Sequence, residues 1–229
     1  MKRHLLSSFI LFISFNLLGQ EDSSDTVFIQ KDSLLGAAQS VFYERNRESK
    51  FYDRISYFGF GKFDERSYDY SKEYLIENKW TLSKQTPLIT WVNWVKLVQY
   101  EGAFYAYHPC DFNAHFKASI NDSTYIDWTG EGPIANKILE QTKIDNQTYQ
   151  FQTAGIYENN RTLVIHIIDS KRGIAIFEES SSEKEKHYYP MIAADLIKSV
   201  PLIVNNCETR KQAELRFEEP NYQEQLELK

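Results

Sequence analysis

The sequence lacks the short motifs that identify several large enzyme classes. It contains no phosphate-binding G-x-x-x-x-G-K-[ST] loop, no dinucleotide-binding G-x-G-x-x-G, no zinc-protease H-E-x-x-H, no C-x-x-C pair and no G-x-S-x-G nucleophile elbow. These absences argue against nucleotide hydrolysis, dinucleotide redox chemistry, zinc proteolysis and serine-type nucleophilic catalysis. We predict no cofactor, and a binding protein rather than an enzyme.

Long runs of basic residues are also missing. The chain carries 26 Lys and Arg against 32 Asp and Glu, a net charge of −6, and its best basic clusters, Lys171-Arg172 and Arg210-Lys211, are two residues long. Nucleic acids and anionic membranes are recognised through clustered positive charge. The sequence therefore predicts no nucleic-acid partner and no polybasic membrane patch.

The N-terminus has the plan of a secretory signal peptide. A short basic region, Lys2 to His4, precedes an apolar stretch from Leu5 to Leu18, and Gly19 is a small residue suited to cleavage. An uncleaved anchor is the competing interpretation, although ~20 apolar residues are normally needed to span a bilayer. Removal of residues 1–19 leaves 24 basic and 32 acidic residues, a net charge of −8. We predict a secreted or periplasmic protein with no transmembrane segment after cleavage.

Cysteine is scarce, with Cys110 and Cys207 as the only two. In an exported protein an even pair indicates one disulfide. Two separate buried thiols are the alternative, because the spacing does not fix the distance between them.

Aromatic residues are abundant, with 15 Tyr and 15 Phe, and they concentrate in Leu88–Trp128. That stretch reads as four β-segments whose side chains alternate with period two, and more short segments follow up to about residue 178 with turn residues between them. The pattern predicts a mainly β fold, an antiparallel meander forming a barrel or sandwich. An up-and-down barrel of the kind seen in lipocalins fits as an architectural analogy, without the sequence motifs of that family.

The domain plan has one β-rich domain over residues 32–219, after a signal peptide (1–19) and a flexible leader (20–31), with a disordered tail (220–229). Asp32-Ser33 followed by an apolar stripe to Phe42 predicts a short N-terminal helix. Further predictions are a strand over Ile55–Gly61, a loop over Asp64–Ser71, a strand over Tyr74–Leu82, a short helix over Met191–Ser199 and a strand over Leu202–Val204.

A possible metal site is formed by His108, Cys110 and His115, because imidazole and thiolate are ligands for transition metals. The simpler interpretation is a hairpin loop with a disulfide-bonded Cys and two ordinary His, and it is the one we favour. No metal is therefore predicted.

Asp127 and Glu131 are the candidate catalytic carboxylates, since glycoside hydrolysis uses a pair of acids about 5–10 Å apart. The alternative is an exposed Glu131 in a Gly-Glu-Gly-Pro turn. Ligand-binding candidates are the amphipathic aromatics Trp94, Tyr105, Tyr107 and Trp128. The sequence thus predicts a monomeric exported protein that binds a small apolar ligand, a glycan or an envelope protein, with a secreted Asp/Glu hydrolase as the alternative.

Overall fold

The computed structural model describes residues 26–34, 37–181, 184–207 and 213–227. The predicted signal peptide, residues 1–19, lies outside this part of the chain. The predicted leader lies partly inside it, because strand β1 begins at Thr26.

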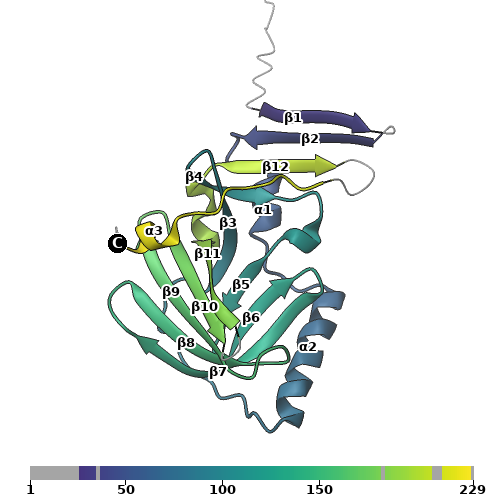
Figure 1. Cartoon of the computed structure of the whole chain (residues 1–229). Coiled ribbons are helices and arrows are strands. Elements are labelled where there is room, and N and C mark those ends of the chain that lie inside the picture. The colour runs from purple at the N-terminus through teal and green to yellow at the C-terminus, as the bar shows by residue number, and fades with distance from the viewer. Residues whose placement is uncertain (1–25, 35–36, 182–183, 208–212, 228–229) are drawn as a thin grey trace, which may run out of the picture.

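The main body is a closed antiparallel barrel of eight strands (Figure 1). Its strands are β3 (Asn93–Tyr100), β5 (Lys117–Ile120), β6 (Thr124–Thr129), β7 (Gly132–Lys143), β8 (Thr148–Ala154), β9 (Arg161–Asp169), β10 (Ile174–Ser181) and β11 (Lys184–Ala193). Strands β5 to β11 pair with their sequence neighbours, and β3 closes the ring by pairing with both β5 and β11. The predicted antiparallel barrel is confirmed.

A second group of strands extends from the far half of β3, and we call it the side sheet. It consists of β1 (Thr26–Leu34), β2 (Ala37–Glu44), β12 (Leu202–Cys207) and β4 (Ala103–His108), in that order, with β4 next to β3. Strand β12 runs parallel to β4 and antiparallel to β2. Figure 1 shows β1, β2 and β12 stacked above the barrel.

The barrel interior is filled by alternate side chains, as the period-two pattern predicts. Trp94, Tyr125, Phe151 and Phe177 are completely buried and occupy its middle. Each such side chain contributes roughly 1.5–3 kcal/mol to the free energy of folding. The centre of the barrel is therefore a packed core rather than a channel.

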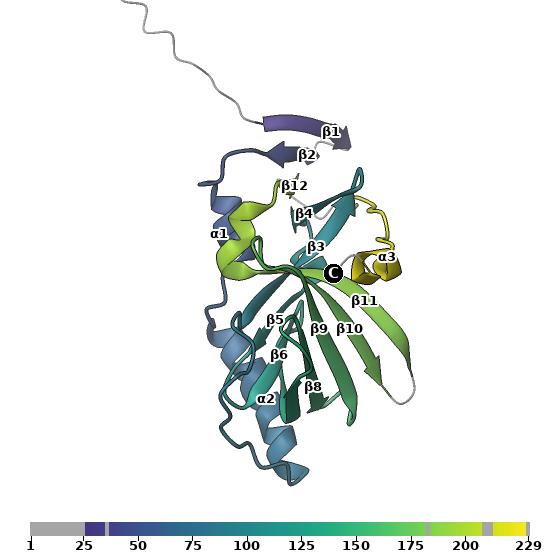
Figure 2. The ribbon, with the colours of Figure 1, turned by 90° about the vertical axis from the view of Figure 1, so that its left-hand side faces the viewer.

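Helices cover the outside. They are α1 (Lys50–Ile55), α2 (Lys62–Glu77), the 3₁₀ helices η1 (Phe112–Ala114) and η2 (Ala194–Ser199), and α3 (Tyr222–Glu227). Helix α2 packs on β7, where Ser71 Oγ accepts a hydrogen bond of 2.8 Å from the Ala135 amide. Helices α1 and η2 lie together beside the side sheet (Figure 2), and Tyr52, Ile55 and Ile197 pack into the cluster beneath them.

The predicted N-terminal helix is not confirmed, because residues 37–44 form strand β2. Val41 and Phe42 are both buried, yet they belong to different clusters on opposite faces of the side sheet. A strand covered on both faces has no period-two alternation of polarity. Its apolar run therefore mimicked a helical stripe.

The predictions for residues 55–82 are also corrected. Asp64–Ser71 and the first four residues of Tyr74–Leu82 belong to helix α2, and Ile55–Gly61 contains the end of α1 and no strand. Ser71 and Leu75, four residues apart, are the two buried positions of α2, whereas Tyr70 is 64% exposed. Tyrosine has a high β-propensity, which favoured a strand in the prediction. Tertiary packing outweighs this propensity, and the segment is a helix.

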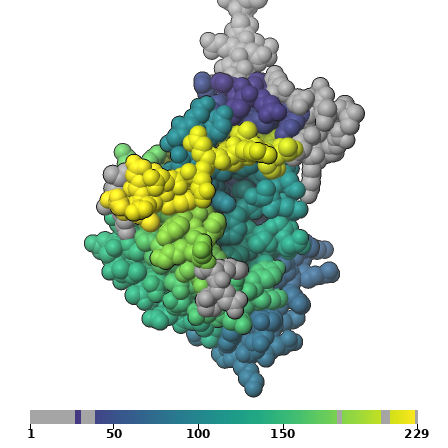
Figure 3. All heavy atoms as spheres, viewed as in Figure 1, coloured from purple at the N-terminus to yellow at the C-terminus, as the bar shows by residue number. Residues whose placement is uncertain are grey.

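The chain ends with a segment that we call the C-terminal strap, residues 213–218. It crosses the outer face of the side sheet, where Leu215 and Phe217 pack on Tyr107 and its aromatic neighbours; the C-terminal residues are yellow in Figure 3. Ala213, Leu215 and Phe217 alternate with polar residues as in a strand, but the described part of the strap forms a single β-bridge, between Gln99 and Glu218. Tyr222–Glu227, which we expected to be disordered, forms α3.

The predicted disulfide between Cys110 and Cys207 is confirmed, with 5.5 Å between the Cα atoms. It joins the residues just after β4 to the last residue of β12. The disulfide thus ties together two parallel strands that are distant in sequence.

Candidate functional site

One end of the barrel carries polar residues at inward-facing positions, and we call it the barrel mouth. Asp127 is in phase with Tyr125 on β6, Arg161 with Leu163 on β9, and Glu179 with Phe177 on β10. Because side chains alternate along a strand, all three polar residues point into the barrel above its apolar core. The sequence pattern that buries the core therefore also buries these charges.

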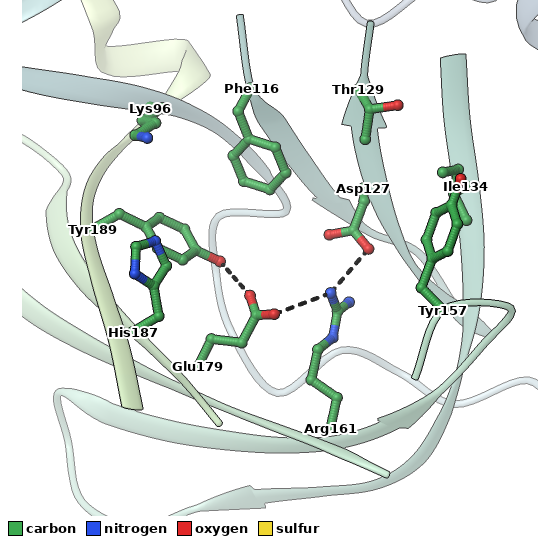
Figure 4. Close-up of a pocket in the computed structure, with 10 residues that line it drawn as sticks. All are labelled: Lys96, Phe116, Asp127, Thr129, Ile134, Tyr157, Arg161, Glu179, His187 and Tyr189. Atoms are coloured by element: carbon green, nitrogen blue, oxygen red, sulfur yellow. Dashed lines mark hydrogen bonds and ion pairs between the residues drawn. The ribbon is translucent and has the colours of Figure 1, made fainter. Parts of the chain in front are cut away.

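Arg161 is the centre of the mouth (Figure 4). Its Nη1 atom lies 3.0 Å from Asp127 Oδ2 and 3.5 Å from Glu179 Oε1. The Tyr189 hydroxyl donates a 3.0 Å hydrogen bond to Glu179 Oε2. Arg161 and Asp127 are each 8% exposed, so the ion pair is largely shielded from water.

Neighbouring residues hold this ion pair in place. Asn136 Nδ2 donates a 2.9 Å hydrogen bond to Asp127 Oδ2, and Arg161 Nε donates one of 3.3 Å to Thr153 Oγ1. The guanidinium also lies over the Tyr125 ring, 4.9 Å from its centroid. Position 155 must be glycine for this arrangement, because a Cβ there would collide with the Asn136 side chain.

Two polar atoms of the ion pair at the mouth have no hydrogen-bond partner among the described residues. Arg161 Nη2 is buried and has no hydrogen-bond partner among the described residues. Within the same part of the chain, Asp127 Oδ1 makes none of the hydrogen bonds or ion pairs, which all go to Oδ2. The Arg161–Asp127 ion pair therefore includes one unused donor and one unused acceptor.

Burial shifts the pKa values of the charged groups in the mouth. Burial lowers the pKa of Arg161, but the carboxylates of Asp127 and Glu179 more than offset this effect and raise it, so Arg161 remains a cation. Burial raises the pKa of Asp127 against the opposing charge of Arg161, and burial lowers the pKa of Lys96. With two acids and two bases, the mouth has no net formal charge while His187 is neutral.

A cavity of about 340 Å³ occupies the mouth. Its floor is closed, because Trp94, Tyr125 and Phe177 fill the barrel below it. Figure 4 shows the side chains that line it, which are Lys96, Phe116, Asp127, Thr129, Ile134, Tyr157, Arg161, Glu179, His187 and Tyr189. The cavity is a shallow cup with polar groups at its centre and aromatic rings on its walls.

The two predicted catalytic carboxylates are not brought together in this cavity. Asp127 lines it, whereas Glu131 lies in the exposed turn between β6 and β7 and is absent from its walls. The Glu131 carbonyl accepts a 3.1 Å hydrogen bond from Ser67 Oγ of α2. The carboxylate that accompanies Asp127 is Glu179.

None of the four aromatic candidates lines the mouth cavity. Trp94 is completely buried in the barrel core, and Trp128 lies on the outer surface beneath Phe58 and Phe60. Tyr105 and Tyr107 belong to the side sheet. The aromatic walls of the cavity come instead from Phe116, Tyr157 and Tyr189.

The candidate metal ligands do not form a site. Cys110 forms the disulfide with Cys207 and so has no free thiolate. The Phe112 ring contacts the rings of His108 and His115, at centroid distances of 5.0 and 5.6 Å. In the described ranges, no three His, Cys, Asp or Glu side chains come close enough together to hold a metal ion. The thiolate version of the metal hypothesis is therefore wrong.

Arg161, Glu179 and Tyr189 were missed by the sequence analysis, although a signal was present. Each stands at an inward position of a strand whose other inward residues are apolar. A charged residue in that phase is unusual, because burying a charge is costly unless it is paired.

Comparisons of the chain with protein-family models, with curated proteins and with solved structures found no match. In the part of the chain that the structure describes, no helix is both long and apolar enough to cross a membrane.

Proposed function

We propose that the protein binds a small, neutral, hydroxyl-rich ligand in the barrel mouth, and that this ligand is a sugar unit of a glycan. The observation that carries the proposal is the unused donor of Arg161 beside the unused acceptor of Asp127. A hydroxyl group can accept a hydrogen bond from Nη2 and donate one to Oδ1 at the same time. Both protein atoms are then satisfied by one ligand group.

The charge of the mouth supports a neutral ligand. A ligand carboxylate accepts hydrogen bonds only, so it satisfies Arg161 but comes close to two further carboxyl groups, those of Asp127 and Glu179. A ligand ammonium meets the opposite conflict with Arg161 and Lys96. A hydroxylated molecule adds no charge to a site that is already balanced.

The shape of the mouth supports a compact ligand. Its volume of about 340 Å³ is at the low end of the ~300–1,000 Å³ range of ligand pockets. The closed floor leaves no space for a long apolar chain, which limits the apolar ligands that the mouth could hold. Tyr157, 69% exposed at the rim, and Phe116 offer ring faces against which the C–H side of a sugar can pack.

Thermal unfolding and calorimetric titration of the mature protein test the proposal. The probes are neutral oligosaccharides, fatty acids and alkylamines, and we expect only the oligosaccharides to raise Tm saturably, because a ligand of the native state alone stabilises it. Tyr157→Ala should weaken this binding about tenfold, since ring contacts of this kind contribute on the order of 1 kcal/mol. Tyr70→Ala is the matched control, because Tyr70 is equally exposed on α2 and does not line the mouth.

A fatty acid that binds while no oligosaccharide does would overturn the proposal, as would equal binding by the two tyrosine variants. The same incubations address the hydrolase alternative, because Asp127 Oδ2 and Glu179 Oε1 contact the same Arg161 nitrogen and so lie no more than about 6.5 Å apart, a limit that includes the ~5–5.5 Å separation of retaining glycosidases. Both acids are paired with Arg161, which favours a binding role over proton donation. If the wild type cleaves the oligosaccharides and Glu179→Gln does not, the proposed function becomes hydrolysis instead of binding.

A further inference from the structure

A second cavity lies in the side sheet, between the ends of β4 and β12, where the Cys110–Cys207 disulfide joins them. We call it the disulfide cleft. Its volume is about 420 Å³, and its walls include Arg54 of α1, His108 of β4, Phe112 of η1 and Asn206 of β12. None of these residues lines the barrel mouth.

His108 is the unusual member of this cleft. It is only 4% exposed, and neither Nδ1 nor Nε2 has a hydrogen-bond partner among the described residues. Its ring is held edge-on between Phe51 and Phe112, each with a centroid distance of 5.0 Å. Buried polar side chains nearly always have a partner, so an imidazole with two unused nitrogens on a cavity wall indicates a missing one.

The other polar side chains of the cleft are Arg54, Asn205 and Asn206, each of which carries N–H donors. Arg54 is the one charged residue among the described lining residues, and it makes no ion pair with any residue the structure describes. Burial first, and then the charge of Arg54, lower the pKa of His108 to about 4, so the ring is neutral near pH 7 and offers one N–H. Asn206 adds a side-chain amide.

The nearby carboxylate of Glu214 is already engaged. It accepts hydrogen bonds from the Tyr107 hydroxyl, from the amides of Cys110 and Asp111, and from Asn205 Nδ2. Its charge also affects the His108 ring less than that of Arg54 does. The cleft therefore keeps an excess of positive potential and unused donors.

We propose that the disulfide cleft is a second binding site, which takes the carboxylate or phosphate oxygens of a small organic anion. Arg54 supplies the charge, and His108 and Asn206 supply hydrogen bonds to the same oxygens. The ring of Phe112, 45% exposed, and Pro109 form an apolar wall for the body of the ligand. This site is separate from the barrel mouth and takes an anionic rather than a neutral ligand.

The test follows the ring resonances of His108 by NMR during titration with benzoate and with inorganic phosphate. Benzamide is the neutral control probe for benzoate. We expect saturable shifts with at least one anion and none with benzamide, and a Kd about tenfold weaker in Arg54→Gln, the equivalent of one charge-assisted hydrogen bond. Arg66→Gln, which removes an exposed charge from α2 instead, should bind as the wild type does.

The proposal is overturned if neither anion gives a saturable shift, if benzamide competes equally with benzoate, or if Arg54→Gln and Arg66→Gln bind alike. Arg54 is exposed and makes no hydrogen bond or ion pair with the described residues, so its variant should fold as the wild type does. Tyr157→Ala, which alters the barrel mouth, should leave anion binding unchanged. Failure at one site is thus distinguishable from failure at the other.

Discussion

The barrel and the side sheet stabilise β-structure in different ways. Each barrel strand has two hydrogen-bonded neighbours, and pairing of β3 with β5 and β11 completes the ring. The side sheet ends at β1, which pairs with β2 alone among the described strands, and its β12–β4 pair is parallel and joins segments almost a hundred residues apart. Loop closure makes such a pairing costly in entropy.

The difference explains where each region places its special interactions. The barrel encloses a buried ion pair, because its walls can surround the charges and supply hydrogen bonds from several strands. The side sheet is instead held at its ends by the disulfide and by the hydrogen bonds of Glu214 in the strap. We therefore expect the stability of the barrel to depend on internal charge pairing, and the stability of the side sheet to depend on the disulfide and on Glu214.

The largest effect is expected in the barrel, from Arg161→Met. It leaves Asp127 buried without its cation, which costs about 3–5 kcal/mol of unfolding free energy. Urea denaturation measures the loss. The double variant Arg161→Met/Asp127→Leu should recover most of it, because an apolar pair in place of a buried ion pair is often neutral. A double variant as unstable as the single one would contradict the role of charge pairing.

The second effect is expected in the side sheet, from Cys110→Ala/Cys207→Ala. The disulfide closes a sequence separation of 97 residues, and its loss should cost roughly 2–4 kcal/mol. Amide hydrogen exchange should accelerate in β4 and β12, whereas β8 and β9 should remain protected. Uniform acceleration through the barrel would show that the two regions unfold as one unit.

Acid should weaken the junction between the regions. Burial is the main cause that lowers the pKa of His108 to about 4 and of His115 to about 3, whereas an unfolded His titrates near 6.5. The unfolded state then binds more protons between these values, so stability is full above about pH 6.5 and falls as the pH is lowered through about 4. His108→Phe should reduce this loss by up to about 3 kcal/mol. Denaturation curves at pH 7 and pH 4.5 measure it, and an unchanged pH slope would contradict the prediction.

The smallest effect is expected from Glu214→Gln in the strap. The carboxylate accepts hydrogen bonds from the Tyr107 hydroxyl and from two backbone amides, and Gln keeps only part of them, at a cost of about 1–2 kcal/mol. Hydrogen exchange of the strap amides should rise with little change in the barrel. Glu73→Gln, at an exposed position of α2, is the matched control. Equal stability of the two variants would show that the strap is held by Leu215 and Phe217 alone.

The sequence predicted the barrel because apolar and polar residues alternate along several of its strands, whose inward residues form the core. Period-two alternation around Ala118 and Ile120 follows directly from that arrangement. The same logic failed for β2, which is covered on both faces, and for α2, where Tyr70 is exposed and the buried positions are Ser71 and Leu75. The local pattern of apolar and polar residues thus indicated which side chains are buried more reliably than it indicated whether a segment is a strand or a helix.

The candidate site was only partly predictable. Asp127 was found, but its partners Arg161 and Glu179 come from strands that meet it only after the barrel closes. The disulfide was expected from the compartment and the even Cys count rather than from geometry. Pairing across a closed ring depends on register, which a single sequence does not fix.

The Cys110–Cys207 bond has a consequence for the integrity of the chain. The segment between the two cysteines contains barrel strands β5 to β11, including every turn that joins them. A protease that cuts one of these turns therefore opens a covalent ring instead of releasing a fragment. The nicked molecule should migrate as one species on a non-reducing gel and separate into two pieces only after reduction, which gives the protein a tolerance to single cuts in the compartment we predict for it.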